Sequence, residues 1–196
     1  DNKSGLTPSG QLKKIFKAVK PLYKQKDNTL ANIEKQLELY DISRMQVNEL
    51  EHADRKFIHQ YFTTYILPVL SPQVVDVHHP FPHLANKSLY IAVMFENGEN
   101  NLFGIIPVPQ ILPKLVFLPG NSLRFVLMEN IILEYANAVF DKLKIADKTI
   151  IAVTRNEDIS PADEDYHEDA DYRRLMKKIL KKRKRLAPVR LEVQND

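Results

Sequence analysis

The sequence predicts an α+β fold in which a long N-terminal helical segment precedes a domain with an antiparallel sheet and several packed helices. Apolar residues recur at three and four residue spacing across residues 12–37, which is the period of an amphipathic helix. Two pairs of extended apolar runs flank short polar connections, a pattern typical of β-hairpins. Helical patterns stand before and after these hairpins, so the second domain is expected to combine both kinds of element.

The composition bounds the class of protein. Of 196 residues, 44% are hydrophobic and 27% are charged, with a formal net charge of +3, which is ordinary for a globular chain with a real core. No apolar run approaches the roughly 18 residues that a bilayer span needs. The absence of Cys excludes a disulfide scaffold, thiolate metal sites and Cys nucleophiles, and favours a reducing cytosol. Because the chain opens at Asp1 without Met or a signal stretch, we expect a piece of a longer protein.

The first element is a helix that begins at Thr7 and Pro8, an N-cap followed by a proline whose missing N–H costs nothing there. Pro21 removes one intrahelical donor, and residues 27–29 are the best candidate for a break, so one long helix and a hairpin of two remain alternatives. The apolar stripe is narrow, and we expect another segment to cover it. That segment belongs either to the rest of this chain or to a part of a longer protein that precedes it. The stripe comprises Leu12, Ile15, Phe16, Val19, Leu22, Tyr23, Leu30, Ile33 and Leu37.

The remaining elements follow in order. A helix is expected through a broad apolar face that ends near Pro68, because the residue before a proline is pushed out of the α region; this face comprises Leu50, Ala53, Phe57, Ile58, Tyr61, Phe62, Tyr65 and Ile66. Strands are expected at 88–95 and 103–108, and again at 115–118 and 123–127. A helix follows over 128–143, then a buried strand at 149–153, a helix from Ser160 to Arg185, and a strand at 189–193.

Catalytic and metal-binding motifs are scarce. The sequence contains no GxGxxG, GxxxxGK or GxSxG motif, so it offers no Gly-rich phosphate cradle and no nucleophile elbow. Three histidines, His78, His79 and His83, stand within six residues, and imidazole nitrogens are common metal ligands. The intervening prolines hold this stretch extended, which favours a packed structural segment over a metal site, with contact to a partner domain as a third reading.

The charge pattern near the end is the other feature that could bind a ligand. Residues 157–171 are rich in acidic side chains, and residues 173–185, here called the basic segment, carry nine Lys or Arg in thirteen positions. On a helix this polarity complements the macrodipole, but nine cations exceed what capping requires. We therefore weigh a solvated helix face against a polyanion site. The candidate polyanion-binding residues are Lys177, Lys178, Lys181, Lys182 and Arg183.

Two consecutive segments resemble the long-chain bacterial polyphosphate kinase family. An aromatic-rich segment at 61–67 runs into PVLSPQVVD at 68–76, and HPFPHLANKSL follows at 79–89. Shorter matches are DNKSGLTPSG at 1–10, RFV at 124–126, VTR at 153–155 and VRLE at 189–192. The resemblance covers essentially the whole chain and departs from the family pattern at Pro21 and Lys87.

The resemblance implies that residues 1–45 end a helical N-terminal domain and that residues 46–196 form a head domain. It also implies that the phosphate-accepting His, the nucleotide-binding residues and the magnesium site belong mainly to C-terminal domains of a parent enzyme. No catalytic residue and no metal ligand is therefore assigned here, and no cofactor is expected in this chain, although ATP and magnesium are implied for the parent. Transfer of a γ-phosphoryl group needs metal-supported charge stabilisation, and no such assembly is visible in the sequence.

The favoured function is thus a non-catalytic N-terminal and head portion of a polyphosphate kinase, which contributes to dimerisation and to the wall of the polyphosphate tunnel. The expected partners are polyphosphate, the C-terminal kinase domains of the same parent and a second copy of the chain. No DNA partner and no transmembrane segment are expected, and the location is cytoplasmic, with peripheral contact to the inner membrane left open. The alternatives are a nucleic-acid module that uses the basic segment and a pure oligomerisation module.

Overall fold

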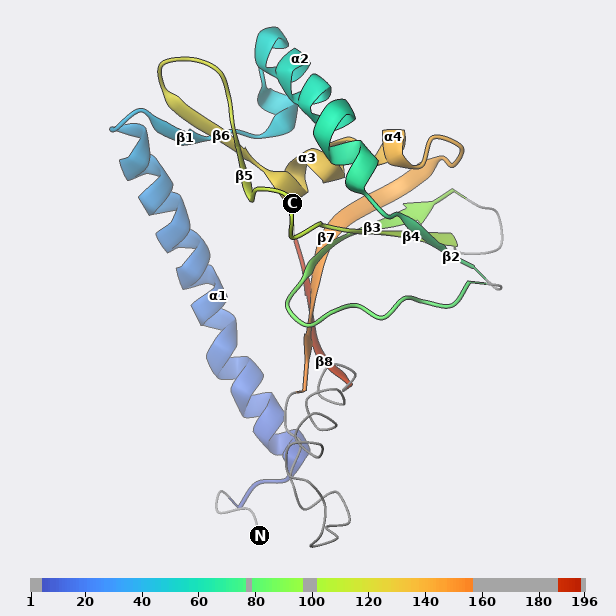
Figure 1. Cartoon of the computed structure of the whole chain (residues 1–196). Coiled ribbons are helices and arrows are strands. Elements are labelled where there is room, and N and C mark those ends of the chain that lie inside the picture. The colour runs from blue at the N-terminus through green and yellow to red at the C-terminus, as the bar shows by residue number, and fades with distance from the viewer. Residues whose placement is uncertain (1–4, 77–78, 97–101, 157–186, 195–196) are drawn as a thin grey trace, which may run out of the picture. The chain divides into compact units, whose positions relative to one another are not determined.

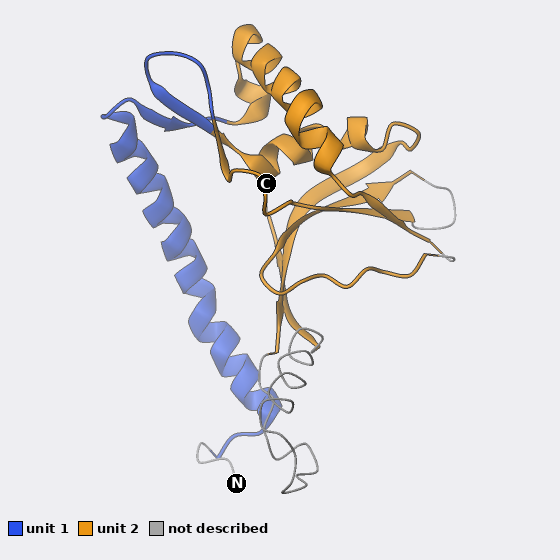
Figure 2. Cartoon of the chain, viewed as in Figure 1, with its two compact units in different colours: residues 1–45, 117–125 blue, residues 46–116, 126–196 orange. Residues whose placement is uncertain are grey.

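A computed structural model describes residues 5–76, 79–96, 102–156 and 187–194. The chain divides into two compact units, which Figure 2 distinguishes by colour. Unit 1 comprises residues 1–45 and 117–125, and unit 2 comprises residues 46–116 and 126–196. The predicted α+β class is confirmed: a long N-terminal helix is followed by an antiparallel sheet with helices (Figure 1).

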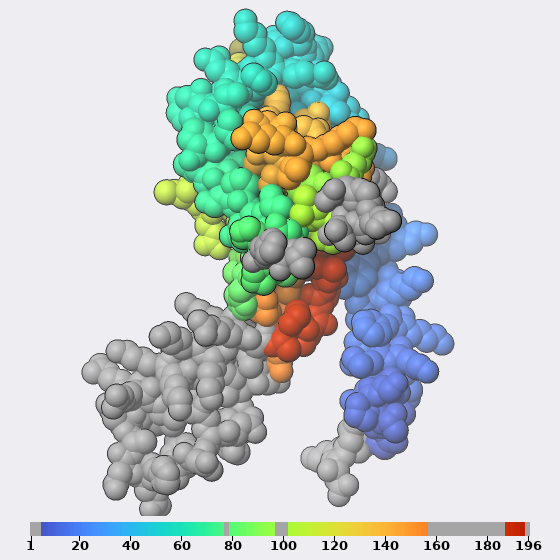
Figure 3. Space-filling view, turned by 90° about the vertical axis from the view of Figure 1, so that its right-hand side faces the viewer, coloured from blue at the N-terminus to red at the C-terminus, as the bar shows by residue number. Residues whose placement is uncertain are grey.

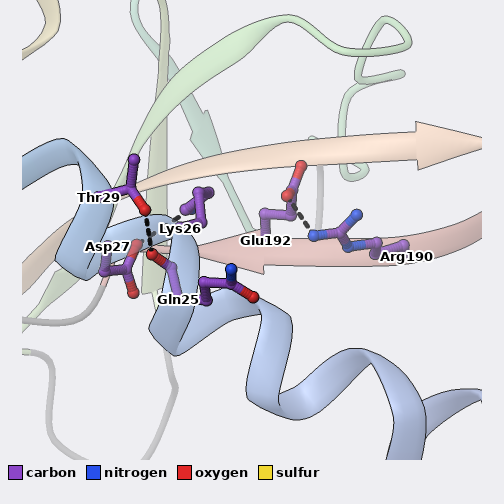
Figure 4. Close-up of polar contacts among 6 residues, drawn as sticks. All are labelled: Gln25, Lys26, Asp27, Thr29, Arg190 and Glu192. Atoms are coloured by element: carbon purple, nitrogen blue, oxygen red, sulfur yellow. Dashed lines mark hydrogen bonds and ion pairs between the residues drawn. The ribbon is translucent and has the colours of Figure 1, made fainter.

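Unit 1 is built around a single long helix, α1 (Pro8–Glu38). Its predicted cap is confirmed, since the Gly10 amide donates to Thr7 Oγ1 at 3.2 Å. The helix continues through Pro21, and the break considered at residues 27–29 does not occur. Thr29 Oγ1 donates to the carbonyl oxygen of Gln25 at 2.8 Å, a bond within one helical turn (Figure 4). Of the two alternatives, one helix is therefore correct.

Unit 1 also contains a parallel strand pair. Strand β1 (Ile42–Arg44) pairs with residues 123–125 of β6 (Leu123–Leu127). The other neighbour of β6 in the sheet is β5 (Leu115–Phe117). Arg44 makes a two-pronged contact with Glu34 of α1, with Nε to Oε1 at 2.8 Å and Nη2 to Oε2 at 3.2 Å. This pair fixes the end of β1 against the last turns of α1. The sequence did not predict β1.

Unit 2 contains a five-stranded antiparallel sheet in the order β2-β4-β3-β7-β8. Its strands are β2 (Gln73–Val75), β3 (Leu89–Phe95), β4 (Leu102–Pro107), β7 (Ile145–Arg155) and β8 (Pro188–Val193). The predicted β3–β4 pairing is confirmed, with Tyr90 opposite Pro107 and Phe95 opposite Leu102. The strand expected at 149–153 is the central part of the longer β7, and the three-residue β2 was not predicted.

The helices of unit 2 start with a short 3-10 turn, η1 (Val47–Glu49), and α2 (His52–Tyr61). A π-helical turn, η2 (Phe62–Ile66), and a 3-10 turn, η3 (Leu67–Val69), follow, so the helix ends near Pro68 as predicted. Figure 3 shows this part of the chain on the surface of unit 2. Helix α3 (Met128–Glu134) and the short α4 (Ala136–Val139) replace the single helix expected over 128–143.

The buried side of α2 differs from the predicted face. The buried residues are Leu50, Asp54, Ile58, Phe62 and Ile66, which repeat at intervals of four. Residues four apart share a face in a regular helix, and the wider π-helical turn keeps Ile66 on the side of Phe62 while it rotates Tyr65 away. Tyr65, expected in the core, is therefore 60% exposed. Ala53 is also exposed, because it precedes this turn and lies beside the buried line of Asp54 and Ile58; both expectations were wrong.

The helix expected at 160–185 lies outside the residues that the structure describes. The expected strand at its C-terminal side is confirmed as β8, which pairs with β7 with Ala152 opposite Glu192. Every residue of β8 is exposed. Arg190 and Glu192 form an ion pair along the strand (Figure 4). Among the described helices, none has both the length and the apolar character needed to cross a bilayer.

Candidate functional site

A surface pocket of about 370 Å³ lies beside α2 in unit 2. Helix α2 contributes His52, Arg55, Lys56 and His59 to its lining. Val47 of η1, Glu134 at the end of α3 and Tyr135 complete the lining. Four basic side chains from one helix thus line one part of the pocket, and a carboxylate, a phenol and an aliphatic side chain line the rest.

Helical spacing explains why the four basic residues face the same way. They stand at positions i, i+3, i+4 and i+7 of α2, and residues at this spacing share one face of a helix. Asp54 and Ile58 lie on the buried side of the same helix. Burial of that side therefore turns the basic face toward solvent, where all four side chains are exposed.

Arg55 is held in place by the loop that precedes α2. Its Nη2 donates to the carbonyl oxygens of Asn48 at 2.9 Å and Leu50 at 3.2 Å. These two bonds use one nitrogen of a planar group with five N–H donors. No ion pair to a carboxylate joins Arg55 or Lys56 in the described part of the chain.

Tyr135 forms the aromatic side of the pocket. It sits at the junction of α3 and α4, with φ −88° and ψ 14°. Its ring stacks on Phe62 at 4.6 Å between centroids and meets the edge of His59 at 5.6 Å. Burial raises the pKa of the Tyr135 phenol, the Glu134 carboxylate raises it further, and Arg55 opposes them. The hydroxyl therefore stays protonated at neutral pH and can donate a hydrogen bond.

The histidine cluster predicted near residue 80 is only partly within the described residues. His78 lies outside them. Asp76 Oδ1 accepts from the His79 amide at 2.7 Å and contacts His79 Nδ1 at 2.9 Å, and the Asp76 amide donates to the His79 carbonyl at 3.1 Å. These contacts hold Asp76 and His79 together. Across the described residues, no group of three His, Asp or Glu side chains is placed to hold a metal ion.

The predicted polyanion residues Lys177, Lys178, Lys181, Lys182 and Arg183 lie outside the described residues, so the structure places none of them. The pocket beside α2, in turn, was missed in the sequence. The available signal was the HxxRKxxH pattern at residues 52–59. The apolar residues of the same helix indicate a core face, and the basic residues between them were not recognised as a second face.

The fold matches one already observed in a solved structure. The crystal structure of polyphosphate kinase from Porphyromonas gingivalis aligns with a TM-score of 0.64 and 22% sequence identity, covering 76% of this chain and 25% of that one. At this identity the likeness concerns the fold.

Sequence comparisons define the family. Residues 53–196 match the family model described as the polyphosphate kinase middle domain. The polyphosphate kinase of Bacillus anthracis is 37% identical over 204 residues, with 98% of this chain and 28% of that protein covered. The polyphosphate kinase of Halalkalibacterium halodurans is 35% identical over 202 residues, with 99% and 28% covered.

The chain belongs to the polyphosphate kinase family, as the resemblance in the sequence indicated. It spans about 28% of the length of the relatives just described.

Proposed function

We propose that this chain is the non-catalytic N-terminal and head portion of a polyphosphate kinase, whose reaction converts ATP and polyphosphate(n) into ADP and polyphosphate(n+1). The observation that carries the proposal is the family match over residues 53–196 in a chain that spans about 28% of its relatives. Residues 1–45 would end the N-terminal domain and residues 46–196 would form the head. The first segment of unit 1 ends at residue 45 and the family match begins at residue 53, which supports a division in this region; unit 1 also includes residues 117–125.

The architectural part of the proposal rests on α1. No residue of this helix is buried, and its apolar stripe is open to solvent, with Phe16 68% exposed and Ile15 53% exposed. Exposed apolar patches on otherwise folded proteins mark interaction surfaces. We infer that the stripe packs against helices of the same N-terminal domain, and that the head contributes to dimerisation.

The polyanion part of the proposal rests on the basic segment. Lys177, Lys178, Lys181, Lys182 and Arg183 would contact polyphosphate along the wall of the tunnel, without base recognition. C-terminal kinase domains of the parent enzyme would bind ATP and magnesium and would carry the phosphate-accepting His. The parent enzyme would act in the cytoplasm. No DNA partner is proposed.

The test of the non-catalytic assignment is incubation of the chain with γ-labelled ATP and magnesium. The expected result is no labelled polymer and no acid-labile label on the protein, because phosphoryl transfer needs a positioned acceptor and metal-supported charge stabilisation. A complete polyphosphate kinase, which must label itself under the same conditions, is the positive control. Acid-labile label on His78, His79 or His83 would overturn the assignment.

A further inference from the structure

We propose that the pocket beside α2 binds a linear run of two or three phosphoryl groups through Arg55, Lys56 and the two flanking histidines. The proposal goes beyond the proposed function, because its residues lie in a different part of the chain from the basic segment. It concerns the class of ligand that the pocket accepts, which is an oligophosphate.

The charge of the pocket favours an anion. Arg55 and Lys56 are cationic, whereas Glu134 is the one carboxylate in the lining. Two positive charges that line the same pocket repel one another. A bound anion removes this repulsion. A cation as ligand would instead add to it.

The shape of the array favours several phosphoryl groups in a row. His52 and His59 are seven residues apart, so the basic face extends roughly 10 Å along the helix axis at about 1.5 Å per residue. A single phosphate would engage part of this length. A run of phosphoryl groups can meet successive basic side chains.

The donor groups suit phosphoryl oxygens. Arg55 is anchored through Nη2 to two backbone carbonyls, which fixes the orientation of the guanidinium and leaves the Nη1 and Nε hydrogens as charge-assisted donors to phosphoryl oxygens. Tyr135 adds a hydroxyl donor beside it. The Tyr135 ring already stacks on Phe62, so the phosphoryl groups of a nucleotide are a better match to this pocket than its base.

Removal of the Glu134 charge should change the affinity for oligophosphate in the opposite direction to removal of a cation. Its carboxylate lines the same pocket and must repel a bound oligophosphate. The Glu134→Gln variant keeps the shape of the side chain and removes the charge. Affinity should therefore rise in this variant, whereas it should fall when a cation is removed.

The experiment is a calorimetric titration of the 196-residue chain with sodium tripolyphosphate at low salt. It is carried out with the native basic segment and with Lys178, Lys181 and Lys182 each changed to Glu, so that binding at the pocket is separated from binding at the basic segment. Lys56→Ala should weaken binding roughly tenfold, the effect of losing one charge-assisted hydrogen bond. Arg55→Lys should also weaken it, since Lys keeps the charge but loses the planar group that is anchored to the Asn48 and Leu50 carbonyls. Glu134→Gln should strengthen it.

The matched control is Lys142→Ala, which removes an exposed Lys of unit 2 that does not line the pocket, and it should leave the affinity unchanged. If ATP binds as tightly as tripolyphosphate, the phosphoryl groups come from the tail of a nucleoside triphosphate. If ATP binds much more weakly, they come from a free end of a polyphosphate chain. Equal affinity of the native chain and Lys56→Ala would overturn the proposal. So would AMP binding as tightly as tripolyphosphate, or equal displacement by an acidic peptide.

Discussion

Gly104 is the position where one added methyl group should test the packing of unit 2 most sharply. It lies in the middle of β4, opposite Val93 of β3 and Val74 of β2. A Cβ at this position would stand 2.8 Å from the ring tips of both Phe95 and Phe140. The two rings form an edge-to-face pair with centroids 5.0 Å apart, and both are almost fully buried.

The expected cost of Gly104→Ala is the difference of two terms. Displacing two packed rings to admit a methyl group costs about 1–3 kcal/mol, as for other overpacked cores. Replacing Gly in a strand regains about 0.5–1 kcal/mol of backbone entropy. We therefore expect a net loss of about 1–2 kcal/mol in the free energy of unfolding, which lowers the melting temperature by roughly 2–8 °C in a chain of this size.

The assay is urea unfolding of four proteins, followed by circular dichroism. They are the native chain, Gly104→Ala, Phe140→Leu and the double variant. Because Leu frees the space that the new methyl group needs, the double variant should be more stable than the sum of the two single changes predicts, by about 1 kcal/mol. Strict additivity, or a Gly104→Ala protein as stable as the native chain, would refute the packing argument.

Two further predictions concern a helix cap and the half-buried phenol of Tyr135. Thr7→Ala should leave the Gly10 amide without its acceptor. The resulting loss of about 1 kcal/mol in helix stability should speed hydrogen exchange of the first turn of α1 roughly fivefold. Ser9→Ala is the control, and equal exchange rates in the two variants would contradict the cap. Since the folded state raises the pKa of Tyr135, the free energy of unfolding should be unaffected by this group below about pH 10 and fall above it. Urea unfolding across this range should show that fall in the native chain and a smaller one in Tyr135→Phe; equal slopes would argue against the shift.

Much of the fold could be predicted because long periodic patterns record which side of an element is buried. The cap at Thr7 and the β3–β4 pairing both rested on signals local in the sequence. The three-residue strands β1 and β2 could not be found this way. Each is too short to show a period, and the parallel pairing of β1 with β6 joins residues about 80 positions apart, which no local pattern records.

The departures within helices have a similar origin. The expected face of the helix that begins with α2 assumed regular α-helical geometry up to Pro68, but the π-helical turn at Phe62–Ile66 has more residues per turn and rotates Tyr65 away from the buried side. The single helix expected after Met128 divides at Tyr135, whose φ and ψ leave the α-helical region. That division brings the Tyr135 ring against Phe62 and into the pocket. The pocket depends on this contact between distant segments, and its aromatic side was therefore invisible in the sequence.

The proposed polyphosphate contact is tested by a polyphosphate titration of the native chain and of the variant with Lys178, Lys181 and Lys182 changed to Glu, at low and at physiological salt. We expect binding that weakens steeply with salt, because neutralised phosphates release condensed counterions. We also expect a marked loss of affinity in the variant without loss of folding, and no preference among single-stranded DNA competitors of different sequence. Equal affinity of both proteins would contradict a polyphosphate contact at the basic segment, and a strong preference for one DNA sequence would favour a nucleic-acid module instead.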